Sequence, residues 1–193
     1  MALARRDLLR FAATAALLPM PRLLGQLIEE APQGKEATDM TRDLPTSVQM
    51  QFMRPDQLEA AAKAFPVVYV PFGLIEWHGK HLPLGNDALK AHAVLVKTAQ
   101  MFGGVVYPPI YYPWALWNNG KLAQRELDVA VPLLRNLFMS LKKTGFRVII
   151  GVSGHNIKEQ ILMIEEALKE VTADGTVAGA GLWEVSLTQD SDS

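Results

Sequence analysis

The order of apolar and polar positions predicts strands and helices that alternate along the chain. A short helix is expected at 55–64, followed by a continuous apolar run at 66–72. Such a run predicts a strand that is buried on both faces, which is typical of parallel sheets. Helical spacing then extends from 87 to 102 and ends at a Gly-Gly pair, before a brief strand at 105–107.

The second half of the chain continues the same alternation. Apolar residues recur at helical spacing before Gly145, and a strand is predicted at 147–152. A further helix carries an apolar stripe from Ile157 to Val171, and 176–187 is predicted to be the last strand. The pattern therefore indicates the α/β class: one three-layer domain at 51–193, with a mostly parallel sheet flanked by helices.

The N-terminal region differs from the rest of the chain. Arg5 and Arg6 precede an apolar run at 11–20, so 1–28 is predicted to be a twin-arginine signal segment, with 29–50 as a linker. We expect a periplasmic or secreted protein, and otherwise a cytoplasmic one. The alternative for the run is an amphipathic terminal helix. It is too short to span a bilayer, so no stable membrane anchor is expected.

Composition narrows the kinds of partner and ligand. The net charge is −1 and charges of both signs are interspersed, which argues against a nucleic-acid partner. Because the chain has no cysteine, any metal must be bound by imidazole and carboxylate groups.

Polar side chains gather where two predicted strands end. Glu76, His78 and His81 follow the first strand, and His155 follows the third. Ligands of open α/β sheets bind beyond the carboxyl ends of the strands. Glu76 and His78 are two residues apart in an extended segment and so point to one side, and Asp87 can join them from the next helix. These residues predict a divalent metal site for one or two ions, with a metal-activated hydroxide as the nucleophile.

Each candidate also has a structural alternative. Asp87 could be only the N-cap of its helix, and Asn156 with Glu159 fits a capping box. His81 could hold a turn through a backbone hydrogen bond. His92 and Lys80 are read as a helix residue and a solvated charge. Ser153 has no partners for a serine-hydrolase triad.

The segment from Pro71 to Asp87 reads Pro-Phe-Gly-Leu-Ile-Glu-Trp-His-Gly-Lys-His-Leu-Pro-Leu-Gly-Asn-Asp, and Ser153-Gly154-His155 follows a later strand. These motifs resemble the creatininase (creatinine amidohydrolase) family. The resemblance implies a zinc or manganese amidohydrolase that hydrolyses a cyclic amide or a related C–N bond in a small-molecule substrate. It also implies assembly as a homo-oligomer, often a hexamer. It also implies that Glu76 and His155 bind a different side of a two-metal site from His78, with Asp87 bridging.

The chain also departs from the family pattern. Trp77, Lys80 and Ser153 replace the usual glutamine, proline and asparagine, and Ile157 stands where creatininase has a metal-binding glutamate. Glu159 is a candidate substitute for that glutamate. The family's His-Ala-Gly-Glu segment has no counterpart before residue 193, so we expect the domain to be C-terminally incomplete. The alternative function is a non-catalytic relative that binds metal or a small ligand, or that acts as a subunit.

Two further residues complete the list of candidates. Trp117, together with Trp114, could wall a small planar substrate, and Trp117 is the predicted substrate-binding residue. Packing is the alternative for both. No catalytic proton donor is assigned.

Overall fold

The computed structural model describes residues 47–112 and 124–187. The predicted signal segment at 1–28, most of the predicted linker and Trp117 lie outside these residues, so export and substrate binding by Trp117 stay predictions. Among the described residues, no helix has the length and apolar character needed to cross a membrane.

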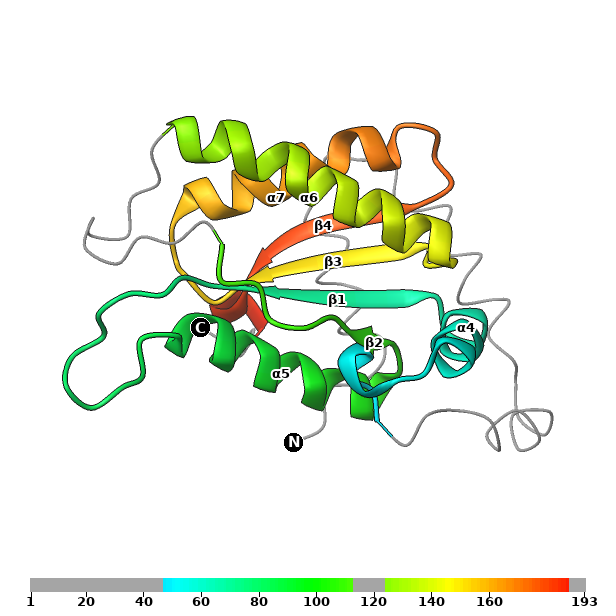
Figure 1. Cartoon of the computed structure of the whole chain (residues 1–193), viewed down its shortest axis with the longest axis horizontal. Helices are drawn as coiled ribbons and strands as arrows, with labels where there is room; N and C mark the ends of the chain where they lie inside the picture. Colours follow the sequence, from blue (N-terminus) through cyan, green and yellow to red (C-terminus); the bar gives the residue numbers. More distant parts are fainter. Residues whose placement is uncertain (1–46, 113–123, 188–193) are drawn as a thin grey trace.

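A parallel sheet of four strands forms the middle layer (Figure 1). Its order is β2-β1-β3-β4, and each neighbouring pair is parallel. The strands are β1 (Val67–Phe72), β2 (Val105–Val106), β3 (Val148–Ser153) and β4 (Ala178–Trp183). Val48 accepts a backbone hydrogen bond from Val106, so backbone contacts with the sheet begin before η1 (Met50–Phe52).

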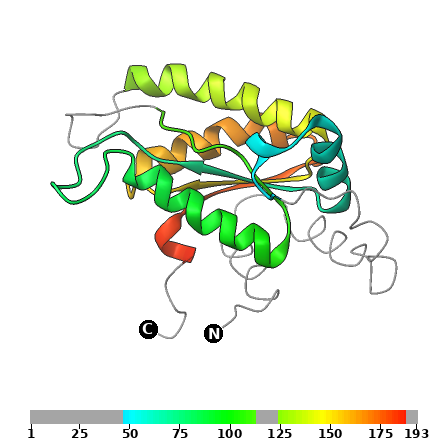
Figure 2. The same ribbon diagram turned by 60° about the horizontal axis from the view of Figure 1, so that its bottom comes forward.

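Helices cover both faces of the sheet (Figure 2). The helices α6 (Gln124–Thr144) and α7 (Lys158–Thr172) lie on one face, and α5 (Asn86–Phe102) lies on the other. The helix α4 (Pro55–Ala64) precedes β1. The predicted three-layer α/β architecture is thus confirmed.

Each face of the sheet has its own apolar core. On the α6–α7 side, Phe72 of β1 meets Phe138 of α6 edge to face, with ring centroids 6.4 Å apart. On the α5 side, Leu95 packs with Tyr69 and Val152. Alternate side chains of β1 and β3 belong to the two cores, so both faces of each strand are buried. This explains the continuous apolar run of β1.

The predicted last strand is too long. The strand β4 ends at Trp183, and Glu184–Leu187 forms the 3₁₀ helix η2 on the α5 side (Figure 2). The reason is electrostatic: the carboxylate of Glu184 is buried and lies 2.9 Å from the ammonium group of Lys90 in α5. That ion pair draws the chain out of the sheet and onto α5.

The crossovers define the place where a ligand can bind. The chain leaves β1 toward α5 on one face and leaves β3 toward α7 on the other, although β1 and β3 are neighbours. In open α/β sheets, ligands bind at such a switch, beyond the carboxyl ends of the strands. The residues that follow β1 and β3 therefore lie where a ligand is expected to bind.

Candidate metal centre

A loop after β1 brings Glu76 and Asp87 together. The chain turns at Gly79, whose φ of 87° is readily adopted only by glycine, and then runs back toward the sheet. The amide of Glu76 donates to the carbonyl oxygen of Leu84 at 2.9 Å, which closes the base of the loop. The helix α5 starts two residues later, so Asp87 lies in its first turn beside Glu76.

Two glycines let the first turn of α5 approach the strand ends. A Cβ atom at Gly73 would lie 2.2 Å from the backbone nitrogen of Ala88, and one at Gly154 would lie 2.0 Å from the carbonyl oxygen of Asp87. Real Cβ atoms essentially never come within 3.0 Å of such atoms. The absence of side chains at both positions therefore sets how close Asp87 comes to β1 and β3.

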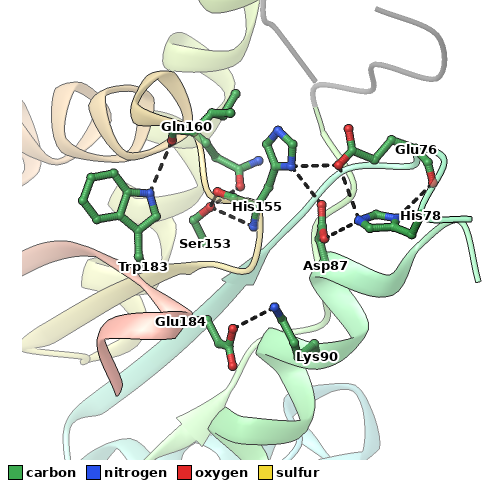
Figure 3. A network of polar contacts seen from close by, with 10 residues as sticks. Glu76, His78, Asp87, Lys90, Ser153, His155, Gln160, Trp183 and Glu184 are labelled. Carbon is green, nitrogen blue, oxygen red and sulfur yellow. Dashed lines mark hydrogen bonds and ion pairs between the residues drawn. The ribbon is translucent and has the colours of Figure 1, made fainter. Parts of the chain in front are cut away.

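Four side chains converge at this point (Figure 3). The ring atom Nδ1 of His155 lies 3.0 Å from a carboxylate oxygen of Glu76 and 3.0 Å from one of Asp87. The Nε2 atom of His78 lies 2.8 Å from the other oxygen of Asp87 and 3.4 Å from Glu76. Asp87 therefore contacts both imidazoles, one through each oxygen. The structure brings together all four predicted ligands.

The ring orientation of His78 suits a ligand. Its Nδ1 atom lies 3.1 Å from the backbone carbonyl oxygen of Glu76, to which it can only donate. The Nε2 atom then faces the two carboxylates and is the ring nitrogen available to a metal ion. Metal-binding histidines commonly donate their other ring N–H to a carbonyl in this way.

Burial and charge act in opposite directions on the two carboxyl groups. Burial raises the pKa of Glu76, and the adjacent Asp87 raises it further, although His155 and His78 counteract both effects. Burial would also raise the pKa of Asp87, but the hydrogen bonds and positive charges of His155 and His78 bring it below its ordinary value. Asp87 is thus the carboxylate that stays ionised most readily.

The donor set fits a divalent cation. Ligand atoms of Glu76, Asp87 and His155 all lie within 4.8 Å of one another, and Asp87 and His155 are buried. Two neighbouring carboxylates in a partly buried site repel each other, and a cation between them would remove that repulsion. Carboxylate oxygens and imidazole nitrogens are ligands that zinc and manganese accept.

Other candidates lie outside this group. His81, Lys80 and Glu159 are exposed, and none of them belongs to the ligand group. The exposed Glu159 therefore does not replace the carboxylate that Ile157 lacks. His92, on α5, is partly buried, and burial lowers its pKa. Its reading as a helix residue agrees with its position.

The two structural alternatives that rested on helix capping do not hold. Gly85 is the N-cap of α5, so Asp87 lies within the helix and its carboxylate is free to bind the histidines. The N-cap of α7 is Ile157 rather than Asn156, because the backbone at Ile157 is still extended, with φ −114° and ψ 144°. Neither Gly85 nor Ile157 caps its helix with a side chain.

Sequence reasoning missed two polar contacts near the centre. Lys90 pairs with Glu184, as described above, and buried Gln160 meets Ser153 behind His155 (Figure 3). A signal for the second contact was present. Gln160 is a polar residue directly beside Ile161 on the apolar face of α7, where a buried partner is required.

The fold and the site together define an α/β protein with a carboxylate–imidazole centre at the switch point of a parallel sheet. Residues 51–192 match the family model for creatininase, described as creatinine amidohydrolase. The chain belongs to the creatininase family.

Two different hydrolases are similar to this chain. It is 26% identical over 115 residues to a 3-dehydro-scyllo-inosose hydrolase of Thermotoga maritima, which covers 58% of this chain and 37% of that protein. A crystal structure of creatinine amidohydrolase superposes with a TM-score of 0.64 at 22% identity and covers 76% of this chain and 61% of that one.

Two of the solved relatives are named for a metal. A structure called creatininase Mn matches with a TM-score of 0.64 at 22% identity, covering 76% of this chain and 62% of that one. A mutant creatininase of the Zn-Zn type matches with the same TM-score and the same coverage at 21% identity. At this identity the superpositions establish the fold. The chain spans less than two thirds of the length of each of these relatives.

Proposed function

We propose that this protein is a metal-dependent amidohydrolase that hydrolyses a cyclic amide or a related C–N bond in a small molecule. The observation that carries the proposal is the group of Glu76, Asp87 and His155, whose ligand atoms lie within 4.8 Å of one another in a member of the creatininase family. His78 completes the set through its contact with Asp87.

Asp87 is the central residue of the proposed centre. Its two oxygens face different histidines, so it can bind on two sides at once. Glu76 and His155 share one of those sides, and His78 lies on the other, with a weaker contact to Glu76 at 3.4 Å. One ion would be held by Glu76, Asp87 and His155, and a second would have His78 and Asp87 as ligands from this chain.

A divalent ion in such a centre lowers the pKa of a water molecule and polarises an amide carbonyl. The chain's own residues supply the remaining conditions. The close approach of α5 to the end of β3 at Gly154 places Asp87 beside His155, and a site built on packed elements keeps its ligand geometry better than one built on loops. Glu76 and His78 remain partly exposed, so a substrate can reach the centre from solvent.

The proposal is tested with the full chain, freed of metal by a chelator and reloaded with zinc or manganese. Metal content is measured by mass spectrometry, and hydrolysis is measured on a panel of cyclic amides and N-formyl compounds. We expect bound metal and turnover of at least one compound. The Glu76→Gln variant should lose both, whereas the matched Glu159→Gln variant, changed at an exposed glutamate, should keep both. Retention of both by Glu76→Gln would contradict the proposal.

A non-catalytic, metal-binding protein is the second candidate. The observation that favours it concerns the acidic residues near the centre. Glu159 is exposed and Glu184 is committed to Lys90, so neither provides a further carboxylate to the ligand group among the described residues. Stoichiometric metal without turnover on the whole panel would select this candidate over the amidohydrolase.

A further inference from the structure

Two fully buried polar side chains lie behind His155. Ser153 is the last residue of β3 and Gln160 belongs to the first turn of α7, and both are 0% exposed. Figure 3 shows them beside the backbone of His155, while the imidazole of His155 points toward Glu76 and Asp87. A polar side chain is buried at a cost unless its hydrogen bonds are made, so this pair requires a physical explanation.

The hydroxyl of Ser153 holds the backbone of His155 at both ends. The amide of His155 donates to Oγ of Ser153 at 3.2 Å, and the hydroxyl donates to the carbonyl oxygen of His155 at 2.5 Å. That carbonyl oxygen also accepts from the amide of Ile157 at 2.9 Å. The backbone of His155 is therefore hydrogen-bonded on both sides of its Cα atom, through its N–H group and through its carbonyl oxygen.

Gln160 completes the hydrogen bonding of Ser153. As placed, the oxygen Oε1 of its side-chain amide lies 2.5 Å from Oγ, and the amide nitrogen, at the other end, has no partner among the described residues. The serine hydrogen is already used on His155, so the group that faces Oγ must be a donor. The amide therefore presents its NH₂ group to Ser153, because the two ends of a glutamine amide differ in hydrogen bonding rather than in shape.

In that orientation the serine hydroxyl is fully satisfied. It accepts from His155 and from Gln160 and donates once, which uses its whole capacity. The unpaired group of Gln160 becomes a carbonyl oxygen, and buried carbonyl groups lacking a partner occur more often than buried N–H groups lacking one.

We propose that Ser153 and Gln160 are positioning residues that hold the His155 imidazole in register with Glu76 and Asp87 for metal binding. This inference rests on the proposed metal centre. The imidazole must keep its Nδ1 atom 3.0 Å from both carboxylates, and β3 ends two residues earlier, so strand pairing alone does not fix its backbone. Partners behind a metal ligand typically change metal affinity 10- to 100-fold when they are removed, roughly the range expected here.

The test compares Ser153→Ala and Gln160→Met with the wild type. Ser140→Ala is the matched control, since the Ser140 hydroxyl also donates to a backbone carbonyl oxygen but is exposed and lies on α6. Affinity for zinc and manganese is measured by competition with a chromophoric chelator, and cobalt substitution reports ligand geometry through visible absorption. Unfolding of the metal-free proteins by urea measures stability separately.

We expect both variants to bind metal about 10- to 100-fold more weakly, with an altered cobalt spectrum. Ser153→Thr, which keeps the hydroxyl group, should bind metal more tightly than Ser153→Ala. A folded variant that binds as the wild type does, or that loses stability with an unchanged cobalt spectrum, overturns the inference. If Ser153→Ala does not fold, Gln160→Met decides. Failure of the wild type to bind any metal would refute the proposed function instead.

Discussion

Gly154 should be the most sensitive backbone position of the centre. In Gly154→Ala the new Cβ atom would have to move from 2.0 Å to at least 3.0 Å from the carbonyl oxygen of Asp87, because real Cβ atoms essentially never come closer. The first turn of α5 and the end of β3 must separate by about 1 Å to allow this, which would lengthen the 3.0 Å contact between Asp87 and His155. A shift of that size in a reacting site costs on the order of 100-fold in function.

We therefore expect Gly154→Ala to weaken metal binding about 100-fold and to reduce the free energy of unfolding by about 1–3 kcal/mol. Metal affinity is measured by chelator competition, and stability by urea unfolding of the metal-free protein. Gly181→Ala is the matched control. Its Cβ atom would meet the flexible side chain of Glu165 at 3.2 Å, so both quantities should change little. A folded Gly154→Ala protein with an affinity within twofold of the wild type would refute the packing argument.

Three further predictions concern stability, each measured by urea or thermal unfolding. Burial raises the pKa of the Tyr69 hydroxyl from 10.0 to about 12. The contribution of this group to the free energy of unfolding is therefore complete below pH 10 and is lost as the pH rises to 12. Tyr69→Phe should lack that alkaline loss, which amounts to roughly 3 kcal/mol, and an unchanged alkaline profile would contradict this. Hydrogen bonds from Lys142 and Thr176 lower the pKa of Asp174 below its ordinary value of 3.8. The contribution of the Asp174 carboxylate to stability is therefore present above pH 3.8 and is lost as the pH falls below it. Asp174→Asn should therefore show a smaller fall in Tm on acidification than the wild type, and an equal fall would argue against the contact. Lys90→Met should destabilise by about 1–3 kcal/mol because it leaves the Glu184 carboxylate buried without its cation, and Lys90→Met combined with Glu184→Leu should recover most of that loss. A double variant no more stable than Lys90→Met would exclude the ion pair as the cause.

The sequence predicted the sheet and its helices because their signals are local. The apolar stripe of α7 and the continuous run of β1 each follow from burial of their own residues, and the structure confirms both. The end of β4 could not be predicted in the same way. Glu184 leaves the strand because of a partner on α5, and nothing in its neighbouring residues announces Lys90 as that partner.

In the candidate centre, too, some features could be predicted from the sequence and others depend on contacts between distant residues. The sequence predicted that Glu76, Asp87 and His155 would meet, because ligands of open α/β sheets bind beyond the carboxyl ends of the strands. It left Asp87 undecided between cap and ligand, since an aspartate near a helix start fits both roles. The decision depends on Gly85, which takes the capping position, and on Gly154, which admits the carbonyl of Asp87 to the end of β3. Both glycines act through the side chain that they lack. The effect of that absence cannot be predicted from the sequence, because it depends on which backbone atoms lie next to the glycine in the folded chain. Ligand types can therefore be read from the sequence, while the distances between ligands depend on glycine contacts that only the folded chain reveals.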